Sequence, residues 1–287
     1  MDFPNPPVAL ASTGIVPHSR MRTHFLLSSL SPQKKARPMP SNKRFPRLLL
    51  SLLLAFAPMI PAPSVSADEP PAGHPVIVIG FVGGFVKHDN AVHSEVQLAT
   101  RLRRDYPFGV HVEVFENQRR EKAHQQILRL LDINNTGSLS AQGKQQARIV
   151  IYGHSWGASE TVTLARELEK DGIPVLLTIQ VDSITKREQN DMLIPANVRE
   201  AANFYQSTGI LRGRPEIFAA DTTRTQIIGN FRFDYKAHPV SCPNYPWFGR
   251  HFMKSHIEIE CDPNVWNQVE SLIRSKLPSA TGTVSAK

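Results

Sequence analysis

The chain has 287 residues, with 33 Lys and Arg against 25 Asp and Glu, and its formal net charge is +8. Almost all of this excess lies in residues 1–67, which hold eight of the basic residues and one acid, so residues 68–287 carry 25 basic and 24 acidic side chains. Binding to nucleic acid would require a basic excess in the folded part of the chain. We therefore expect no nucleic-acid partner, and the length suits one large domain or two small ones.

Residues 1–67 have the layout of a leader with a secretory signal peptide. A basic n-region near 43–47 precedes an apolar run at 48–57, and small residues follow up to Ala67. A run of about ten residues is too short to span a bilayer as a helix, which needs about 20. We expect cleavage near residue 67 and a secreted or periplasmic chain with no stable membrane span. An uncleaved anchor is the alternative, and Met21 and Met39 are alternative starts.

Apolar runs alternate with helical periodicity from residue 75 onward. Continuous β-branched runs predict buried strands, and apolar residues at spacings of three and four predict amphipathic helices. This alternation is typical of an α/β fold with a mostly parallel central sheet and helices on both faces. The predicted strands are 75–80, 110–115, 149–152 and 175–181, with a later one at 225–231; the predicted helices are 92–102, 121–131, 158–168, 195–207 and a C-terminal one that starts at Asp262-Pro263.

The sequence Gly153-His154-Ser155-Trp156-Gly157 lies between a predicted strand and a predicted helix, within 147–171. This G-x-S-x-G pattern, in this context, is typical of a nucleophilic serine on a tight turn. The turn needs a strained serine backbone, and Gly153 and Gly157 relieve crowding around it. We predict that Ser155 is a catalytic nucleophile.

A serine hydroxyl needs a base to take its proton and an acid to orient that base. With this kind of elbow, the acid and then the base follow the serine along the chain. Asp182 ends the strand after the elbow helix, so it is the predicted acid; His256 precedes the final helix, so it is the predicted base. Asp191, Asp221 and Asp234 are alternatives for the acid, and Asp234 is preferred among these three. For the base, His251 is the preferred alternative and His238 the other histidine that follows the acid. We interpret His154 as a packing residue.

The glycine-rich stretch 80–84 comes at the end of the first predicted strand, and it contains no phosphate-binding motif. It therefore predicts either an oxyanion loop or a plain tight turn. With the elbow, Asp182 and His256, residues 75–277 resemble the α/β-hydrolase superfamily, in particular its small secreted lipase- and esterase-like members. The resemblance implies a reduced version of that fold. It also implies that Trp156 supplies one oxyanion N–H and that Phe81 or Val82 supplies the other, although Gly-Phe-Val-Gly-Gly departs from the HGGG pattern of lipases.

The resemblance implies a serine hydrolase acting on a small-molecule or lipid ester, with no cofactor. A thioesterase, amidase or peptidase would use the same residues, and a non-catalytic binding protein on the same scaffold is a hypothesis of another class. Residues 183–250, between acid and base, are predicted to form a cap or lid, and the aromatic stretch 243–248 is either a pocket wall or core. Cys242 and Cys261 permit a disulfide around His256, or stay as two buried thiols.

Two patterns suggest a metal ion, and we interpret neither as a metal site. Residues 132–140 match the start of a calcium loop, but its twelfth position is Gly143 where a bidentate Glu is needed. A calcium-linked interaction module therefore remains a minor alternative. His88, Asp89 and His93 lack further ligands at suitable spacing, so we expect them to be polar surface near a helix start.

Overall fold

The computed structural model describes residues 75–132 and 136–279. The predicted leader at 1–67, its cleavage site and the alternative starts lie outside the described residues and stay predictions. The described residues belong to one compact unit.

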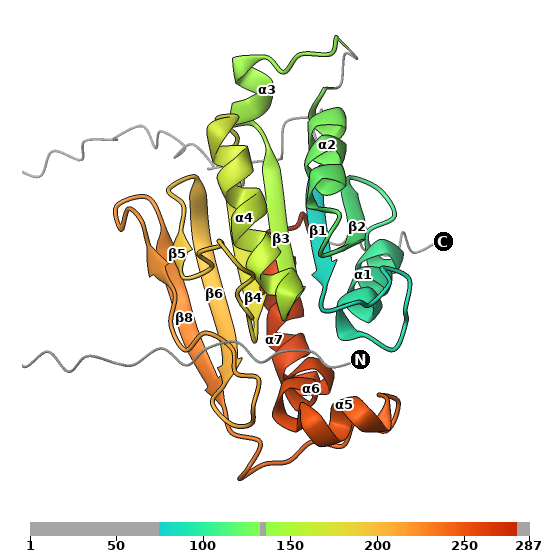
Figure 1. Ribbon diagram of the computed structural model, residues 1–287. Coiled ribbons are helices and arrows are strands. Elements are labelled where there is room, and N and C mark those ends of the chain that lie inside the picture. The colour runs from blue at the N-terminus through green and yellow to red at the C-terminus, as the bar shows by residue number, and fades with distance from the viewer. Residues whose placement is uncertain (1–74, 133–135, 280–287) are drawn as a thin grey trace, which may run out of the picture. The chain divides into compact units, whose positions relative to one another are not determined.

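Six parallel strands form the central sheet, in the order β2-β1-β3-β4-β6-β8 (Figure 1). Two further short strands pair separately. The predicted early strands are confirmed, and β1 continues two residues beyond its predicted end. The strands are β1 (Val76–Val82), β2 (Val110–Glu116), β3 (Arg148–His154), β4 (Val175–Val181), β5 (Leu193–Ile194), β6 (Val198–Gln206), β7 (Phe218–Ala219) and β8 (Gln226–Phe233).

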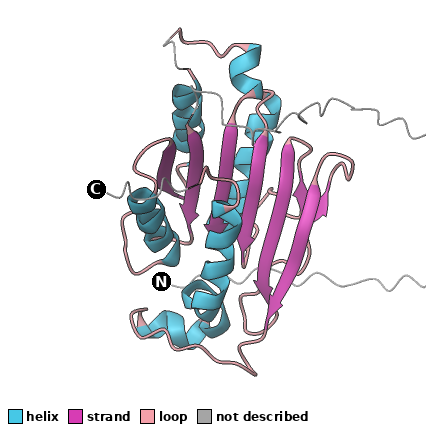
Figure 2. Cartoon of the chain, turned by 180° about the vertical axis from the view of Figure 1, so that it is seen from behind, coloured by secondary structure: helices cyan, strands magenta, loops and turns pink. Residues whose placement is uncertain are grey.

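Helices cover both faces of the sheet (Figures 1 and 2). Buried residues of α1 and α7 pack in one core, and those of α2 and α4 pack in the other. Across the described part of the chain, no helix is long and apolar enough to cross a membrane. The helices are α1 (Ser94–Asp105), α2 (Arg120–Leu131), α3 (Ala141–Gln145), α4 (Trp156–Lys170), α5 (Trp247–Phe252), α6 (Lys254–Cys261) and α7 (Pro263–Arg274).

The predicted helix at 195–207 is wrong, because this segment contains strand β6. Val198, Ala201, Ala202 and Tyr205 have helical spacing, but the strand lies between β4 and β8 and is covered on both faces. A strand in that position can bury consecutive residues on both faces, as it does at 201–204. Pairing with two neighbours therefore outweighs the local pattern.

The segment 183–250 also contributes β8 to the central sheet, and so it is not a separate cap as a whole. The strand at 225–231 is confirmed as β8. The connections at 182–197 and 207–225 contain no helix, unlike the earlier ones. Within this segment, these connections and α5 are the parts that could cover a site.

The chain thus has a reduced α/β-hydrolase fold, as predicted. The strand order reverses at β1, so the carboxyl ends of β1 and β3 form a topological switch point, the usual place of a site in such sheets. Gly83, Ser155 and Asp182 directly follow β1, β3 and β4, and Gln206 ends β6. One edge of the sheet therefore collects these four residues.

Candidate active site

Ser155 has the strained backbone that the sequence predicts for this turn. Its φ and ψ are 56° and −124°, in a region that side chains rarely adopt. The two glycines have no room for a side chain: a Cβ on Gly153 would lie 2.6 Å from the carbonyl carbon of Gly157, and one on Gly157 would lie 2.8 Å from the oxygen of Val82. This crowding explains both glycines of the pattern and leaves the serine hydroxyl at the edge of the sheet.

The structure brings Ser155, His256 and Asp182 together in a hydrogen-bonded chain. Nε2 of His256 lies 2.9 Å from Oγ of Ser155, and its Nδ1 lies 2.6 Å from Oδ2 of Asp182. All three are buried. His256 lies within helix α6, which directly precedes the final helix α7.

The carboxylate of Asp182 is held by donors that the sequence reasoning missed. Gln206 donates to it from its side chain at 2.9 Å and from its backbone at 3.2 Å, and the N–H of Gly213 donates at 2.8 Å. A Cβ on Gly213 would lie 2.6 Å from the Cα of Asp182, so only glycine fits there. The position of Gln206 at the end of a central strand is the available signal, but the helical spacing of residues 195–207 conceals that strand.

The alternative acids have other partners. Asp191 is buried and pairs with Ser183 and Arg214, while Asp221 and Asp234 bond to nearby backbone N–H groups. Each of these carboxylates is therefore already bound elsewhere.

The alternative bases lie away from the serine. The Nδ1 of His251 lies 3.1 Å from the carbonyl oxygen of Trp247, four residues earlier. Both His251 and His238 are exposed, whereas His256 is buried against Ser155. The structure therefore brings only His256 of these three histidines to the serine.

The predicted oxyanion donors lie at the start of α4 and at the end of β1. Trp156 begins helix α4, so its N–H has no acceptor inside the helix and the positive end of the helix faces the site. Phe81 and Val82 lie within β1, not on a loop. Gly83 is the first residue past the strand, and a Cβ on it would lie 2.9 Å from the Cβ of Ser155. The backbone at Gly83 therefore passes directly beside the serine.

A buried polar cluster lies behind His256, and the sequence reasoning missed it. The ring of His154 lies 4.6 Å from that of His256, and its Nδ1 lies 3.5 Å from Oε2 of Glu260. The Nδ1 of His93 bonds to the other oxygen of Glu260, and Glu95 completes the group. His154 is therefore more than a packing residue.

Burial dominates the electrostatics of this cluster. Burial lowers the pKa of His154 to about 4, although the nearby Glu260 opposes this, so its ring is neutral at pH 7. Burial, and then the charge of Glu260, raises the pKa of Glu95 well above its usual range. The N–H groups of Gly83 and Glu95 face this carboxyl and oppose the rise, but neither completes a hydrogen bond with it.

Two further features border the site. The structure joins Cys242 and Cys261 in a disulfide that encloses α5 and most of α6. Of the aromatic stretch 243–248, Tyr245 is buried, while Trp247 and Phe248 are exposed. The stretch therefore contributes both to the core and to the surface.

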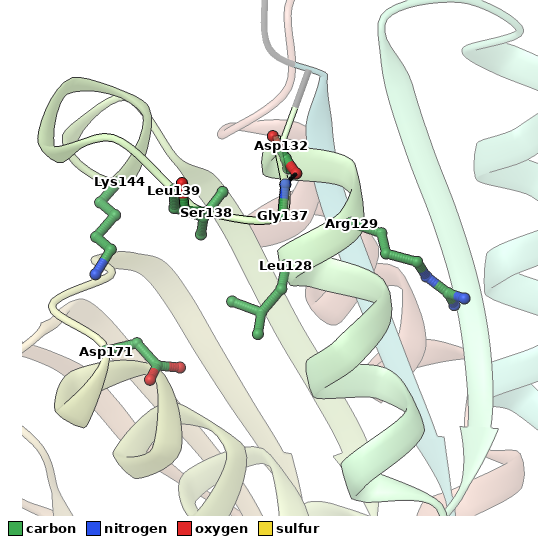
Figure 3. A pocket seen from close by; sticks show the side chains of 8 residues that line it. All are labelled: Leu128, Arg129, Asp132, Gly137, Ser138, Leu139, Lys144 and Asp171. Carbon is green, nitrogen blue, oxygen red and sulfur yellow. Dashed lines mark hydrogen bonds between the residues drawn. The ribbon is translucent and has the colours of Figure 1, made fainter. Parts of the chain in front are cut away.

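A cavity of about 310 Å³ lies at the other end of α4 (Figure 3). Ser155 and Asp171 cap opposite ends of this 15-residue helix, which at 1.5 Å per residue is about 22 Å long. The cavity is therefore remote from the serine. Its lining residues are Leu128, Arg129, Asp132, Gly137, Ser138, Leu139, Lys144 and Asp171.

The calcium-like loop borders this cavity, and the carboxylate of Asp132 is bonded to backbone N–H groups of the same loop. Oδ1 of Asp132 accepts from the N–H of Thr136 at 3.1 Å, and Oδ2 accepts from the N–H of Gly137 at 2.7 Å. Gly143 lies in helix α3. These bonds support the interpretation of the segment as a turn.

The comparisons with known proteins give no assignment by sequence. No family model matches the chain. No curated protein matches it either.

Solved structures that resemble the chain do so at low similarity. A thermostable esterase from Pseudomonas putida is 12% identical, with a TM-score of 0.37 over 71% of this chain and 73% of its own. A thioesterase of the prodiginine pathway in Streptomyces coelicolor is 11% identical, with a TM-score of 0.36 over 77% and 98%. Human thioesterase 2 is 8% identical, with a TM-score of 0.35 over 72% and 98%. Similarity of this degree adds no argument about the reaction.

Proposed function

We propose that this chain is a serine hydrolase that cleaves carboxylic esters through an acyl-enzyme intermediate. The observation that carries the proposal is the hydrogen-bonded chain from Ser155 through His256 to Asp182, with donor–acceptor distances of 2.9 and 2.6 Å. A strained serine at a helix N-terminus, bonded to a histidine that is itself bonded to a buried carboxylate, is the arrangement that nucleophilic catalysis requires.

In the proposed mechanism, Nε2 of His256 takes the proton of Ser155 as its Oγ attacks the acyl carbon. Asp182 accepts from Nδ1, which fixes the tautomer of the ring and stabilises its cation. The ring then gives the proton to the leaving alcohol, and the acyl group stays on Ser155 as an ester. Water attacks this ester with His256 again as the base, and the free carboxylic acid leaves.

The tetrahedral intermediate needs donors for its oxyanion. The N–H of Trp156, at the start of α4, suits this role, and Phe81 or Val82 at the end of β1 supplies the second donor in this proposal. Loss of one such donor costs about 100- to 1000-fold in turnover.

The arrangement favours acyl transfer without selecting the leaving group. Thioesters and amides would be attacked by the same Ser155, so a panel of acyl esters, thioesters and amides with one acyl group decides among these classes. Varying the acyl length of the best substrate then measures the reach of the acyl pocket.

We also propose that the chain is exported. The leader pattern at 1–67 supports this, and a disulfide between Cys242 and Cys261 suits an oxidising compartment. N-terminal sequencing of the protein from the culture medium or periplasm is expected to start near residue 68, and an intact Met1 would contradict the proposal.

The test of the reaction is hydrolysis of a chromogenic short-chain ester by the wild type and by Ser155→Ala. We expect the variant to lose at least about 10⁴-fold in kcat/KM, because no other group provides the nucleophile. Asp234→Asn is the matched control and is expected to keep wild-type activity. Equal activity of Ser155→Ala and the wild type would refute the assignment.

A further inference from the structure

The cluster behind His256 is built from residues far apart in the sequence. His93 and Glu95 come from the start of α1, His154 from the end of β3 and Glu260 from α6. All four are buried, with at most 9% of any residue exposed. Such a concentration of ligand-type side chains, out of contact with solvent, requires an explanation other than surface polarity.

The polar atoms of this cluster are incompletely paired. Neither carboxylate oxygen of Glu95 receives a hydrogen bond, and the Nε2 of His154 also lacks a partner. A buried carboxyl without a donor is costly unless a positive charge or a proton compensates for it. Glu95, which is fully buried, points this unpaired group toward the other three residues.

We propose that His93, Glu95, His154 and Glu260 bind one divalent transition-metal ion, with zinc as the best fit. Two imidazole nitrogens and two carboxylates form a mixed donor set that suits zinc, whereas calcium and magnesium prefer oxygen ligands alone. The two carboxylates would balance the two charges of the ion. The proposal does not depend on the proposed hydrolytic function.

The donor atoms of His93, Glu95 and Glu260 lie close to one another, and His154 borders both carboxylates, so small side-chain shifts would bring the four to tetrahedral spacing. Bond lengths of about 2.0–2.1 Å separate the donor atoms of tetrahedral zinc by about 3.3–3.5 Å. Nδ1 of His154 lies 3.5 Å from Oε2 of Glu260 and 3.9 Å from Oε1 of Glu95. Donor atoms of His93, Glu95 and Glu260 all lie within 4.8 Å of one another. Nδ1 of His93 is hydrogen-bonded to Oε1 of Glu260, so these two atoms would move apart to hold the ion between them.

Four protein ligands complete a tetrahedron, so the site has the composition of a structural one rather than a catalytic one with an open position. The ion would tie α6 to the start of α1 and to the end of β3. Because α6 carries His256 and β3 leads into Ser155, this link would fix the position of His256 relative to Ser155. The sequence could not reveal this role of His93, since Glu260 lies 167 positions away.

His88 and Asp89, which the sequence pattern grouped with His93, do not belong to the cluster. His88 is exposed and pairs with Glu116 at 2.8 Å, and Asp89 is exposed as well. The ligand set therefore follows from the fold and not from the local spacing.

The experiment measures metal binding by the full chain, independently of activity. Protein purified without chelator is analysed by elemental mass spectrometry, then stripped with a chelator and titrated with ZnCl₂ by calorimetry and thermal unfolding. We expect one zinc per chain, a lower Tm after stripping, and its recovery on adding zinc.

Glu95→Gln is the decisive variant, because glutamine keeps the shape of the side chain and removes the charged ligand. We expect its zinc affinity to fall at least about 100-fold, and its Tm to no longer rise with zinc. The metal-free variant should melt close to the stripped wild type, since glutamine keeps the size and shape of the buried side chain. The control Glu121→Gln, on the exposed face of α2, should bind zinc like the wild type.

Three results would overturn the proposal: wild type without stoichiometric zinc and without a zinc-dependent Tm, zinc binding that Glu95→Gln leaves unchanged, or stabilisation by calcium but not by zinc. If Glu95→Gln does not fold, His93→Gln replaces it, with the exposed His238→Gln as its control. The same outcomes then decide.

Discussion

The two ends of α4 carry polar groups of very different origin. At its N-terminal end, His256 lies 101 positions from Ser155 and 74 from Asp182, yet bonds to both. Near its C-terminal end, the carboxylate of Asp132 bonds, among the described residues, to Thr136 and Gly137, four and five positions away. The first arrangement exists only in the folded chain, whereas the second needs nothing beyond its own turn. Convergence of distant side chains, more than the presence of a cavity, therefore marks the end where we expect chemistry.

The largest effect that would distinguish the two ends of α4 is expected from Asp182→Asn. An asparagine keeps the shape but cannot hold His256 in the right tautomer, so we expect kcat for the best ester to fall about 10⁴-fold. Steady-state kinetics against the wild type measure this. Activity within tenfold of the wild type would show that another carboxylate orients the base.

A smaller effect is expected from Gln206→Leu, which removes the side-chain donor at 2.9 Å from Asp182 but preserves the bulk of the side chain. We expect kcat to fall about tenfold with little change in KM, because orientation is affected rather than binding. A kcat equal to that of the wild type would leave Gln206 with a purely structural role.

The smallest effect is expected at the other end, from Asp132→Asn. Ester hydrolysis should be unchanged, and Tm should fall slightly as the bonds to the N–H groups of Thr136 and Gly137 weaken. A tenfold loss of activity would contradict the division between the two ends.

The pH dependence of this small stabilisation has a definite sign. The N–H of Thr136 in particular, with that of Gly137, lowers the pKa of Asp132, so the carboxylate stabilises the fold fully above its unfolded pKa of about 3.9. The contribution is lost as the pH falls through the lower folded pKa. The Tm difference between wild type and Asp132→Asn should therefore shrink below about pH 4, and a difference that grows with acidity would contradict this.

The sequence predicted what depends on local pattern. The strand–serine–helix turn can be recognised because Gly153 and Gly157 lie two positions before and after Ser155 in the chain. Buried parallel strands can be recognised as apolar runs. The same logic failed at β6, where Val198, Ala201, Ala202 and Tyr205 happened to repeat with helical spacing.

What depends on long-range contact could not be predicted. His256 was identified by its order along the chain, but its place on α6 follows from packing. Gln206 and Gly213 support Asp182 only because β6 pairs with β4 and the loop after β6 returns to the end of β4. Glu95 and Glu260 have no shared motif, and they meet only because α1 and α6 pack at the same edge of the sheet.

The most direct test of the central claim is covalent labelling with a fluorophosphonate, followed by mass spectrometry of the peptides. The account predicts one label per chain, on Ser155, with loss of ester hydrolysis in proportion to labelling and no label on Ser155→Ala. A chain that stays unlabelled, or that carries its label on another residue while hydrolysis is lost, would contradict it.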